Sequence, residues 1–479
     1  MVPFLGIVRL TLKTAVRSNI FQLLLLVLLV CIVAVPTSIA GDGTARGYIQ
    51  ISLKYSLAMT GFILSLSSVW LGCFIMSRDT ETYQLHMVVT KSISRLTVWV
   101  GKWTGIVLIH LVLLLLASLT IYFIVQYQYH RQSFSAEEKQ RIENEVMVAR
   151  RVYYPIMPKM DELARKELAR RLEINKRSGR TVDKSQMAQD QLFQDIKREI
   201  VSRYSQIAFG EVREWRYENL PTDYTGPVFL RFRFYVSKIG GNEQRLSQGL
   251  WILGFPFLPE EQETGKQKVT EQKDIKEKKY NFAAYPMSQG PEQIMSGEFH
   301  ERVISSKFIS ANGEMLIAFQ NFDTNREGMF FQPADGPKIL VSAGSFTSNY
   351  FRAVLVIFIQ LLIMAGLGCA AASVLSMPTA VFLVISYIIA GSLSILLSGT
   401  TYFSGPADYL GSYMGKILLL FVIPLQAFDI SYYVAGGELI EFSLIGSIFL
   451  QYFILRGVPF FLLGMFLYKR RELGLVIRK

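Results

Sequence analysis

Long apolar runs dominate the chain and predict helices that cross a membrane. A hydrocarbon core of roughly 30 Å needs about 20 apolar residues in helical conformation. Runs of this kind lie at 20–40, 53–76, 105–125, 353–377, 380–397 and about 443–468. A shorter run, 417–428, is interrupted by Pro424 and is too short to cross. The pattern predicts six transmembrane helices in residues 20–125 and 350–468, with a re-entrant segment at about 414–430.

Residues 126–349 have a different pattern, which predicts a separate α+β domain. Residues 134–210 combine charged residues with apolar positions at helical spacing, and Ser135 and Glu138 form a capping-box pair. From residue 226 to 345, short alternating segments such as VFLRFRFYV are separated by Gly, Pro, Asn and Asp. Such segments indicate an antiparallel β-sandwich of the jelly-roll type.

The distribution of Lys and Arg predicts the orientation of the chain. Of the 479 residues 51% are hydrophobic and 18% charged, and the net charge is +12. Basic clusters precede the first run, separate the second from the third, and form the tail 469–479. Because basic loops stay in the cytoplasm, both termini are expected inside and 126–349 outside. Residues 1–19 fit an amphipathic helix on the cytoplasmic lipid interface, and the alternative is a simple extension of the first transmembrane helix. Acidic residues interleaved with basic ones argue against a nucleic-acid surface.

The motifs of familiar enzymes are missing from the sequence. The chain has no Gly-x-x-x-x-Gly-Lys-Ser/Thr, and its four histidines lie in four separate segments without the spacing of zinc ligands. Two intramembrane residues are candidates instead. His110 is expected to bond to a neighbouring helix. Arg456 is either a substrate or gating contact, or a structural partner of Glu438, Glu441 or a backbone carbonyl.

The loop between the second and third runs carries a family resemblance. It reads SRDTETYQLHMVVTKSISRLTVWVGKWTG, and it resembles the intracellular coupling segment of permeases of the type-two ATP-binding-cassette exporter family. Ser92 stands where that family commonly has proline. The ending FLYKRRELG and the stretch 424–429 also resemble this family.

The resemblance implies a coupling helix at about 79–97 and a set of partners. Its expected contacts with a separate cytoplasmic ATPase are Glu81, Thr82, Tyr83, Leu85, Met87, Lys91 and Arg95. That ATPase would bind ATP and Mg²⁺, while this chain would bind no cofactor and catalyse no reaction. A homodimer or a paired homologous permease is implied, surrounded by lipid in a bacterial plasma (inner) membrane.

Three alternatives remain open at this point. The basic loop can be a simple positive-inside anchor. The helices can conduct nothing and instead relay the ATPase stroke to the outer domain, or merely anchor a binding domain. In the last case Trp251, Phe255, Phe257 and Tyr285 are candidates for a glycan site, although aromatic residues of this kind more commonly pack in a core.

Overall fold

The structure, a computed structural model, divides into two compact units. It describes residues 2–38, 44–81, 93–131, 134–178, 186–236, 245–257, 281–398 and 406–470. The helical unit comprises Met1–Ala149 and Gly344–Lys479, and the β-rich unit comprises Arg150–Ala343. The β-rich unit is shorter than the insert predicted at 126–349. At the first end of that insert, the third long helix continues to Arg131, and Glu145 forms an ion pair with Arg46 within the helical unit.

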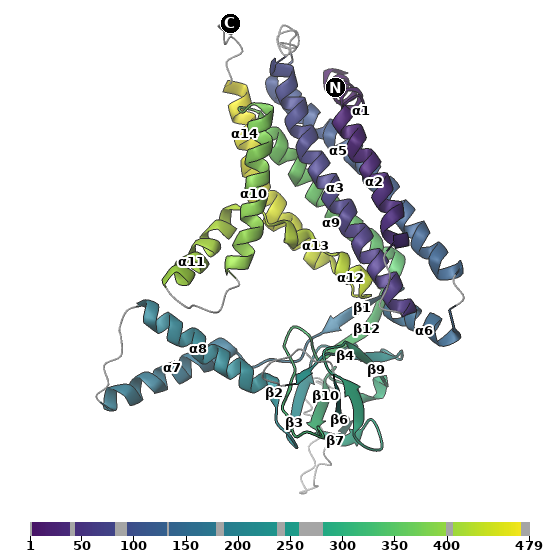
Figure 1. Cartoon of the computed structure of the whole chain (residues 1–479), viewed down its shortest axis with the longest axis vertical. Coiled ribbons are helices and arrows are strands. Elements are labelled where there is room, and N and C mark those ends of the chain that lie inside the picture. The colour runs from purple at the N-terminus through teal and green to yellow at the C-terminus, as the bar shows by residue number, and fades with distance from the viewer. Residues whose placement is uncertain are drawn as a thin grey trace, which may run out of the picture. The chain divides into compact units, whose positions relative to one another are not determined.

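The helical unit consists almost entirely of helices. In chain order they are α1 (Val2–Val16), α2 (Asn19–Ser38), α3 (Ala45–Glu81), α5 (Arg95–Arg131), α6 (Ala136–Glu145), α9 (Phe346–Ala372), α10 (Met377–Ser398), α11 (Pro406–Phe421), η3 (Leu425–Phe428), α12 (Ser431–Ala435), α13 (Phe442–Ile448), η4 (Phe449–Gly457) and α14 (Val458–Arg470). Figure 1 shows these helices in chain order by colour.

Five described helical segments are long and apolar enough to cross a membrane. They are Ala45–Arg78, Arg95–His130, Phe346–Ala372, Met377–Ser398 and Phe442–Arg470. Two bent pairs raise the number to seven if each pair is one span: Pro3–Val16 with Asn19–Ala34, bent by 69°, and Leu410–Phe421 with Leu425–Ala435, bent by 56°. The chain therefore has the helices of a membrane-embedded protein, and the segment predicted as re-entrant is bent.

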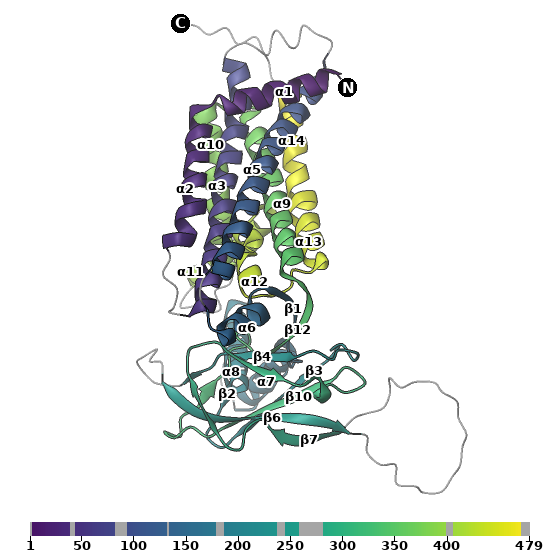
Figure 2. The same cartoon turned by 90° about the vertical axis from the view of Figure 1, so that its right-hand side faces the viewer.

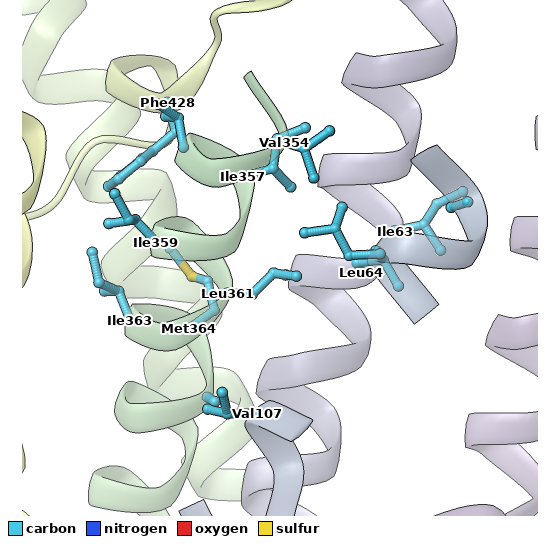
Figure 3. Close-up of a cluster of buried hydrophobic side chains, with 14 of the residues drawn as sticks. Ile63, Leu64, Val107, Val354, Ile357, Ile359, Leu361, Ile363, Met364 and Phe428 are labelled. Carbon is cyan, nitrogen blue, oxygen red and sulfur yellow. The ribbon is translucent and has the colours of Figure 1, made fainter. Parts of the chain in front are cut away.

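Close backbone contact joins α3 to α9 in the centre of the helical unit. A Cβ atom on Gly72 would lie 3.1 Å from the carbonyl oxygen of Ala365, and one on Gly368 would lie 2.7 Å from that of Val69. Small residues allow helix backbones to approach in this way. In lipid the hydrophobic effect does not drive helices together, so close van der Waals packing of this kind stabilises their association. Figure 3 shows other buried apolar side chains of α3, α5 and α9 in this unit, together with Phe428.

The last long helical segment changes its winding near the middle. Residues Phe449–Gly457 form a π-helix between α13 and α14. This change ends just before Pro459, whose missing backbone N–H leaves a carbonyl of the preceding turn without its helical donor. The first segment bends instead at residues 17–18, where α1 turns from α2 and lies across the other helices (Figure 2).

The β-rich unit contains a helical hairpin and three sheets. The hairpin pairs α7 (Met160–Arg177) with α8 (Gln186–Ser205), which lie side by side in Figure 1. An ion pair between Arg171 and Glu199 joins them at 2.7 Å. The strands are β1 (Val148–Tyr153), β2 (Gln206–Ile207), β3 (Val212–Tyr217), β4 (Val228–Phe232), β5 (Tyr235–Val236), β6 (Leu246–Phe257), β7 (Asn281–Pro286), β8 (Glu292–Met295), β9 (His300–Ile304), β10 (Met315–Asn321), β11 (Met329–Phe330) and β12 (Lys338–Ser345).

The sheet orders are β1-β12-β4-β9, β3-β10-β6-β7 with β8 also on β6, and β2-β11-β5. Every registered pair is antiparallel, as in the β6–β10 pairing of Trp251 with Phe319. Side chains from the two larger sheets form one buried cluster around Trp251. Position 249 in β6 requires glycine, because a Cβ atom there would lie 2.1 Å from the ring of Phe319, a member of this cluster. The predicted antiparallel strands are confirmed.

A buried charge network crosses the four-stranded sheet. Glu301 on β9 accepts from Arg150 at 2.9 Å and also pairs with Arg231 on β4, its neighbour in register. The side chain of Arg150 is 0% exposed and that of Glu301 is 6% exposed. Burial by itself raises the pKa of Glu301, but the charges and hydrogen bonds of Arg231 and Arg150 outweigh it, so the pKa lies below its ordinary value.

Local sequence signals were reliable for caps and unreliable for one strand. The capping box at Ser135 and Glu138 is present at the start of α6. The prediction that 134–210 is helical is wrong at β1, since Val148–Tyr153 forms a strand. The alternation in VFLRFRFYV predicts a half-buried strand over Val228–Val236, but all five residues of β4 are buried, and half-buried residues occur only from Arg233 onward. Arg231 can be buried in β4 because its charge is paired with Glu301.

Candidate functional site at the start of α5

The predicted coupling segment lies between the end of α3 and the start of α5. Glu81 is the last residue of α3, and Arg95 is the first residue of α5. Thr82, Tyr83, Leu85, Met87 and Lys91 lie outside the described residues. Within the predicted helix 79–97, residues 79–81 belong to α3 and 95–97 to α5, and residues 82–92 lie outside the described part of the chain.

Polar contacts fix the first turns of α5. Ser94 caps the helix, because its hydroxyl accepts a hydrogen bond from the backbone N–H of Thr97 at 3.1 Å. Arg95 donates to the carbonyl oxygen of Lys469 in α14 at 2.9 Å. Lys102, only 4% exposed, donates from Nζ to the carbonyl oxygen of Ile75 in α3 at 3.1 Å. The start of α5 is thus tied to the last turns of both α3 and α14.

Two tryptophans extend this attachment to α9. The indole Nε1 of Trp99 donates to the hydroxyl of Ser373 at 3.0 Å, and that of Trp103 donates to the carbonyl oxygen of Leu362 at 3.2 Å. Both rings also lie near Phe461 of α14, with centroids 6.4 and 6.1 Å away. A buried indole N–H that has an acceptor fixes the orientation of the ring, so α5 has a defined rotation against α9.

The N-terminal helix α1 packs on the same part of α5. A Cβ atom on Gly101 would lie 2.9 Å from Cγ2 of Ile7, and one on Gly105 would lie 2.7 Å from Cβ of Thr11. These glycines form a Gly-x-x-x-Gly pair, whose spacing places both on one face of a helix. Sequence reasoning missed this contact, although the glycine spacing at the start of the third apolar run was a usable signal.

The two intramembrane candidates both contact polar protein atoms. His110 is buried, its Nδ1 donates to the carbonyl oxygen of Ile106 at 2.8 Å, and its Nε2 lies 3.1 Å from the hydroxyl of Ser67 in α3. This geometry agrees with the expectation that His110 forms a hydrogen bond to a neighbouring helix, here from α5 to α3.

Arg456 lies at the end of the π-helix. It donates to the carbonyl oxygen of Val422 at 2.7 Å, and its guanidinium lies 5.0 Å from the centroid of the Tyr452 ring. Arg456 therefore bonds to a backbone carbonyl, which is one of the structural partners that the sequence analysis proposed for it. The contact connects the last long helix to the segment just after α11, where the bent pair changes direction.

The aromatic residues proposed for a glycan site have different environments. Trp251 is buried in the core of the β-rich unit, at 3% exposure. Phe255, Phe257 and Tyr285 are exposed. The ring of Phe308, which the sequence did not single out, lies 5.9 Å from that of Phe255 and 5.6 Å from that of Tyr285. The structure thus separates one core residue from an exposed group of rings.

The chemistry of the α5 site is attachment and positioning. Its described side chains are indoles, a capping hydroxyl and two cations bound to carbonyls, which hold helices in place. Among the described residues, no group of three or more His, Cys, Asp or Glu is placed to hold a metal ion. Comparison of the chain with protein-family models, curated proteins and solved structures found no match.

Proposed function

We propose that this chain is the membrane-spanning permease subunit of an ATP-binding-cassette exporter. In this proposal the chain has six crossings, with both termini in the cytoplasm of a bacterial inner membrane and the β-rich unit outside as a β-sandwich. A separate cytoplasmic ATPase binds ATP and Mg²⁺ and docks on residues 79–97. Two permeases, identical or homologous, form the transport unit. The chain itself binds no nucleotide.

The attachment of α5 at its first turns is the observation that supports this proposal most. A segment that receives a push transmits it only if its ends are fixed to the parts that must move. Residues 82–94 connect α3 to α5, and the contact of Lys102 with Ile75 joins these two helices just beyond the ends of that segment. Trp99 and Trp103 carry the attachment on to α9. Displacement of the segment would then shift several helices together.

Affinity capture of the tagged full chain from its native membrane tests the proposal. The expected result is a co-purifying protein that hydrolyses ATP and contains a Gly-x-x-x-x-Gly-Lys-Ser/Thr motif. Lys91→Glu and Glu81→Ala should weaken capture, since they change charges on the docking segment. Lys54→Glu, at the opposite end of α3, is the matched control. Arg95→Glu is less informative, because Arg95 also holds Lys469.

Equal capture of the ATPase by the native chain, Lys91→Glu and Glu81→Ala would refute docking at this segment. Absence of any ATPase from the captured complex would refute the wider proposal.

The exposed aromatic group favours a second function, in which the β-rich unit does the work. Phe255 and Tyr285 are 47% and 59% exposed beside Phe308, a platform suited to a sugar ring or a protein loop. A chain in which a flexible linker replaces residues 150–343 separates the two candidates. If it captures the ATPase but fails to complement a strain that lacks the gene, the relay or binding function is favoured. Complementation by the shortened chain favours conduction by the helices.

A further inference from the structure

A cavity of about 240 Å³ lies within the helical unit, away from the start of α5. Its walls come from α3, α9, α10 and the bent segment 425–431. The lining includes the apolar residues Leu57, Phe62 and Ile357. It also includes the polar residues Gln360, Ser392, Gln426, Asp429 and Ser431, of which Gln426 and Asp429 are exposed at the surface. A lining that combines apolar and polar residues suits a molecule with a polar head and an apolar body.

Gln360 supplies a fixed acceptor in the cavity wall. Its side chain is buried, at 5% exposure, and its Nε2 donates to the hydroxyl of Ser65 at 2.9 Å. That bond orients the amide, and Oε1 lies 3.9 Å from the position of a Cβ atom on Gly61, another residue of the lining. The oxygen is therefore on the cavity side, where a hydrogen-bond donor can reach it.

Asp429 supplies the charge. Its Oδ1 accepts from the hydroxyl of Ser431 at 2.7 Å, which fixes the carboxylate while leaving acceptor capacity for another donor. Among the described residues that line the cavity, Asp429 is the only charged one, and none is Lys or Arg. The lining therefore offers acceptors and one negative charge, which favours a cation and disfavours a phosphate or carboxylate group.

The depth of the cavity indicates where the apolar body would lie. Leu57 and Phe62 are 4 and 9 residues beyond Leu53, where the second apolar run begins. At about 1.5 Å per residue they lie roughly 6 to 14 Å inside the edge of that run. Phe62 is 54% exposed, so the cavity mouth on this side is apolar. A polar head can occupy the lining while its chain continues along the lipid-facing surface.

We propose that this cavity binds an alkylammonium amphiphile, with the ammonium group on Asp429 and Gln360 and the chain passing Phe62. The inference goes beyond the proposed function, because binding by this chain alone requires no ATPase. It stays testable if capture of an ATPase fails.

Photolabelling of the purified full chain in nanodiscs tests the inference. The probe is a hexadecylamine with a diazirine on its chain, and the comparison probe is the corresponding alkyl sulfate. Because the diazirine is on the alkyl chain, mass spectrometry should find the amine on peptides that cover 57–62 and 353–357, with an excess of at least about tenfold over the sulfate, as expected for one charge-assisted hydrogen bond. Comparable labelling by the two probes would overturn the inference.

Matched variants make the test specific. Asp429→Asn keeps an oxygen for Ser431 but removes the charge, and should reduce amine labelling about tenfold, whereas Asp408→Asn, outside the lining, should not. A Cβ atom on Gly446, which lies outside the lining, would have nothing within 4 Å, so Gly446→Ala should label as the native chain does. Gly61→Leu fills the cavity and should block labelling. Unchanged labelling of Asp429→Asn would overturn the inference even if Gly61→Leu failed to fold.

Discussion

Adding one methyl group to Gly105 should detach α1 from α5. In Gly105→Ala the new Cβ atom would lie 2.7 Å from Cβ of Thr11, which is 0.7 Å inside the 3.4 Å at which ordinary contact begins. Thr11 is buried and branched at Cβ, so no flexible end of a side chain can move aside. Overpacking of this kind costs about 1 to 3 kcal/mol. Because α1 contacts α5 through one face of the helix, this free energy should weaken the packing of α1 on α5.

Amide hydrogen exchange of the purified full chain measures this cost directly. If α1 opens locally, amide exchange over residues 2–16 should accelerate by about 5- to 150-fold, the equivalent of 1 to 3 kcal/mol. Gly6→Ala is the matched control in α1, since a Cβ atom there has nothing within 4 Å. It should slow exchange instead, because alanine stabilises a helix by up to about 1 kcal/mol relative to glycine.

Exchange in Gly105→Ala that is as slow as in the native chain would refute the reasoning. It would mean that α1 accommodates the methyl group by a small shift, so that the Gly-x-x-x-Gly pair does not determine docking.

Three further predictions concern the β-rich unit and the orientation of the chain. Glu301→Gln should lower the free energy of unfolding by about 3 to 5 kcal/mol in urea titrations, because it removes the carboxylate that pairs with Arg150 and Arg231. As a control, Glu298→Gln at an exposed position should change this free energy by less than about 0.5 kcal/mol. The native chain should lose the same stabilisation in acid, because the pKa of Glu301 is lower in the folded state than its ordinary value of 4.5. The stabilisation is fully present above pH 4.5, and it disappears as pH falls through the pKa of Glu301 in the folded state. Glu301→Gln should lack this acid dependence, and a matching slope in both proteins would contradict the assignment. An impermeant maleimide applied to intact cells should label Lys307→Cys but not Met87→Cys, and labelling of Met87→Cys from outside would refute the proposed topology.

The local parts of the fold could be predicted because their causes are local. An apolar run forms a helix in lipid whatever surrounds it, since every backbone polar group must bond within the segment. The capping box of Ser135 and Glu138 likewise depends on neighbouring residues alone. β1 was missed because its residues have no strong pattern, and Arg150 is buried only through a glutamate 151 residues away.

The candidate site divides in the same way. The sequence placed basic and apolar residues between the second and third apolar runs, and it marked His110 and Arg456 as costly in lipid. It contained the glycine pair at 101 and 105, but nothing in the sequence alone shows that α1 covers these glycines.

The sequence by itself determined that the chain is rich in helices long and apolar enough to cross a membrane and carries an inserted unit of antiparallel strands, because hydropathy and alternation act over short stretches. Only the tertiary structure decided which atoms satisfy Lys102, Trp99 and Trp103, and which side chains of α3, α9 and 425–431 enclose a cavity. Such contacts join residues far apart in the chain, and their formation depends on how complete helices pack against one another.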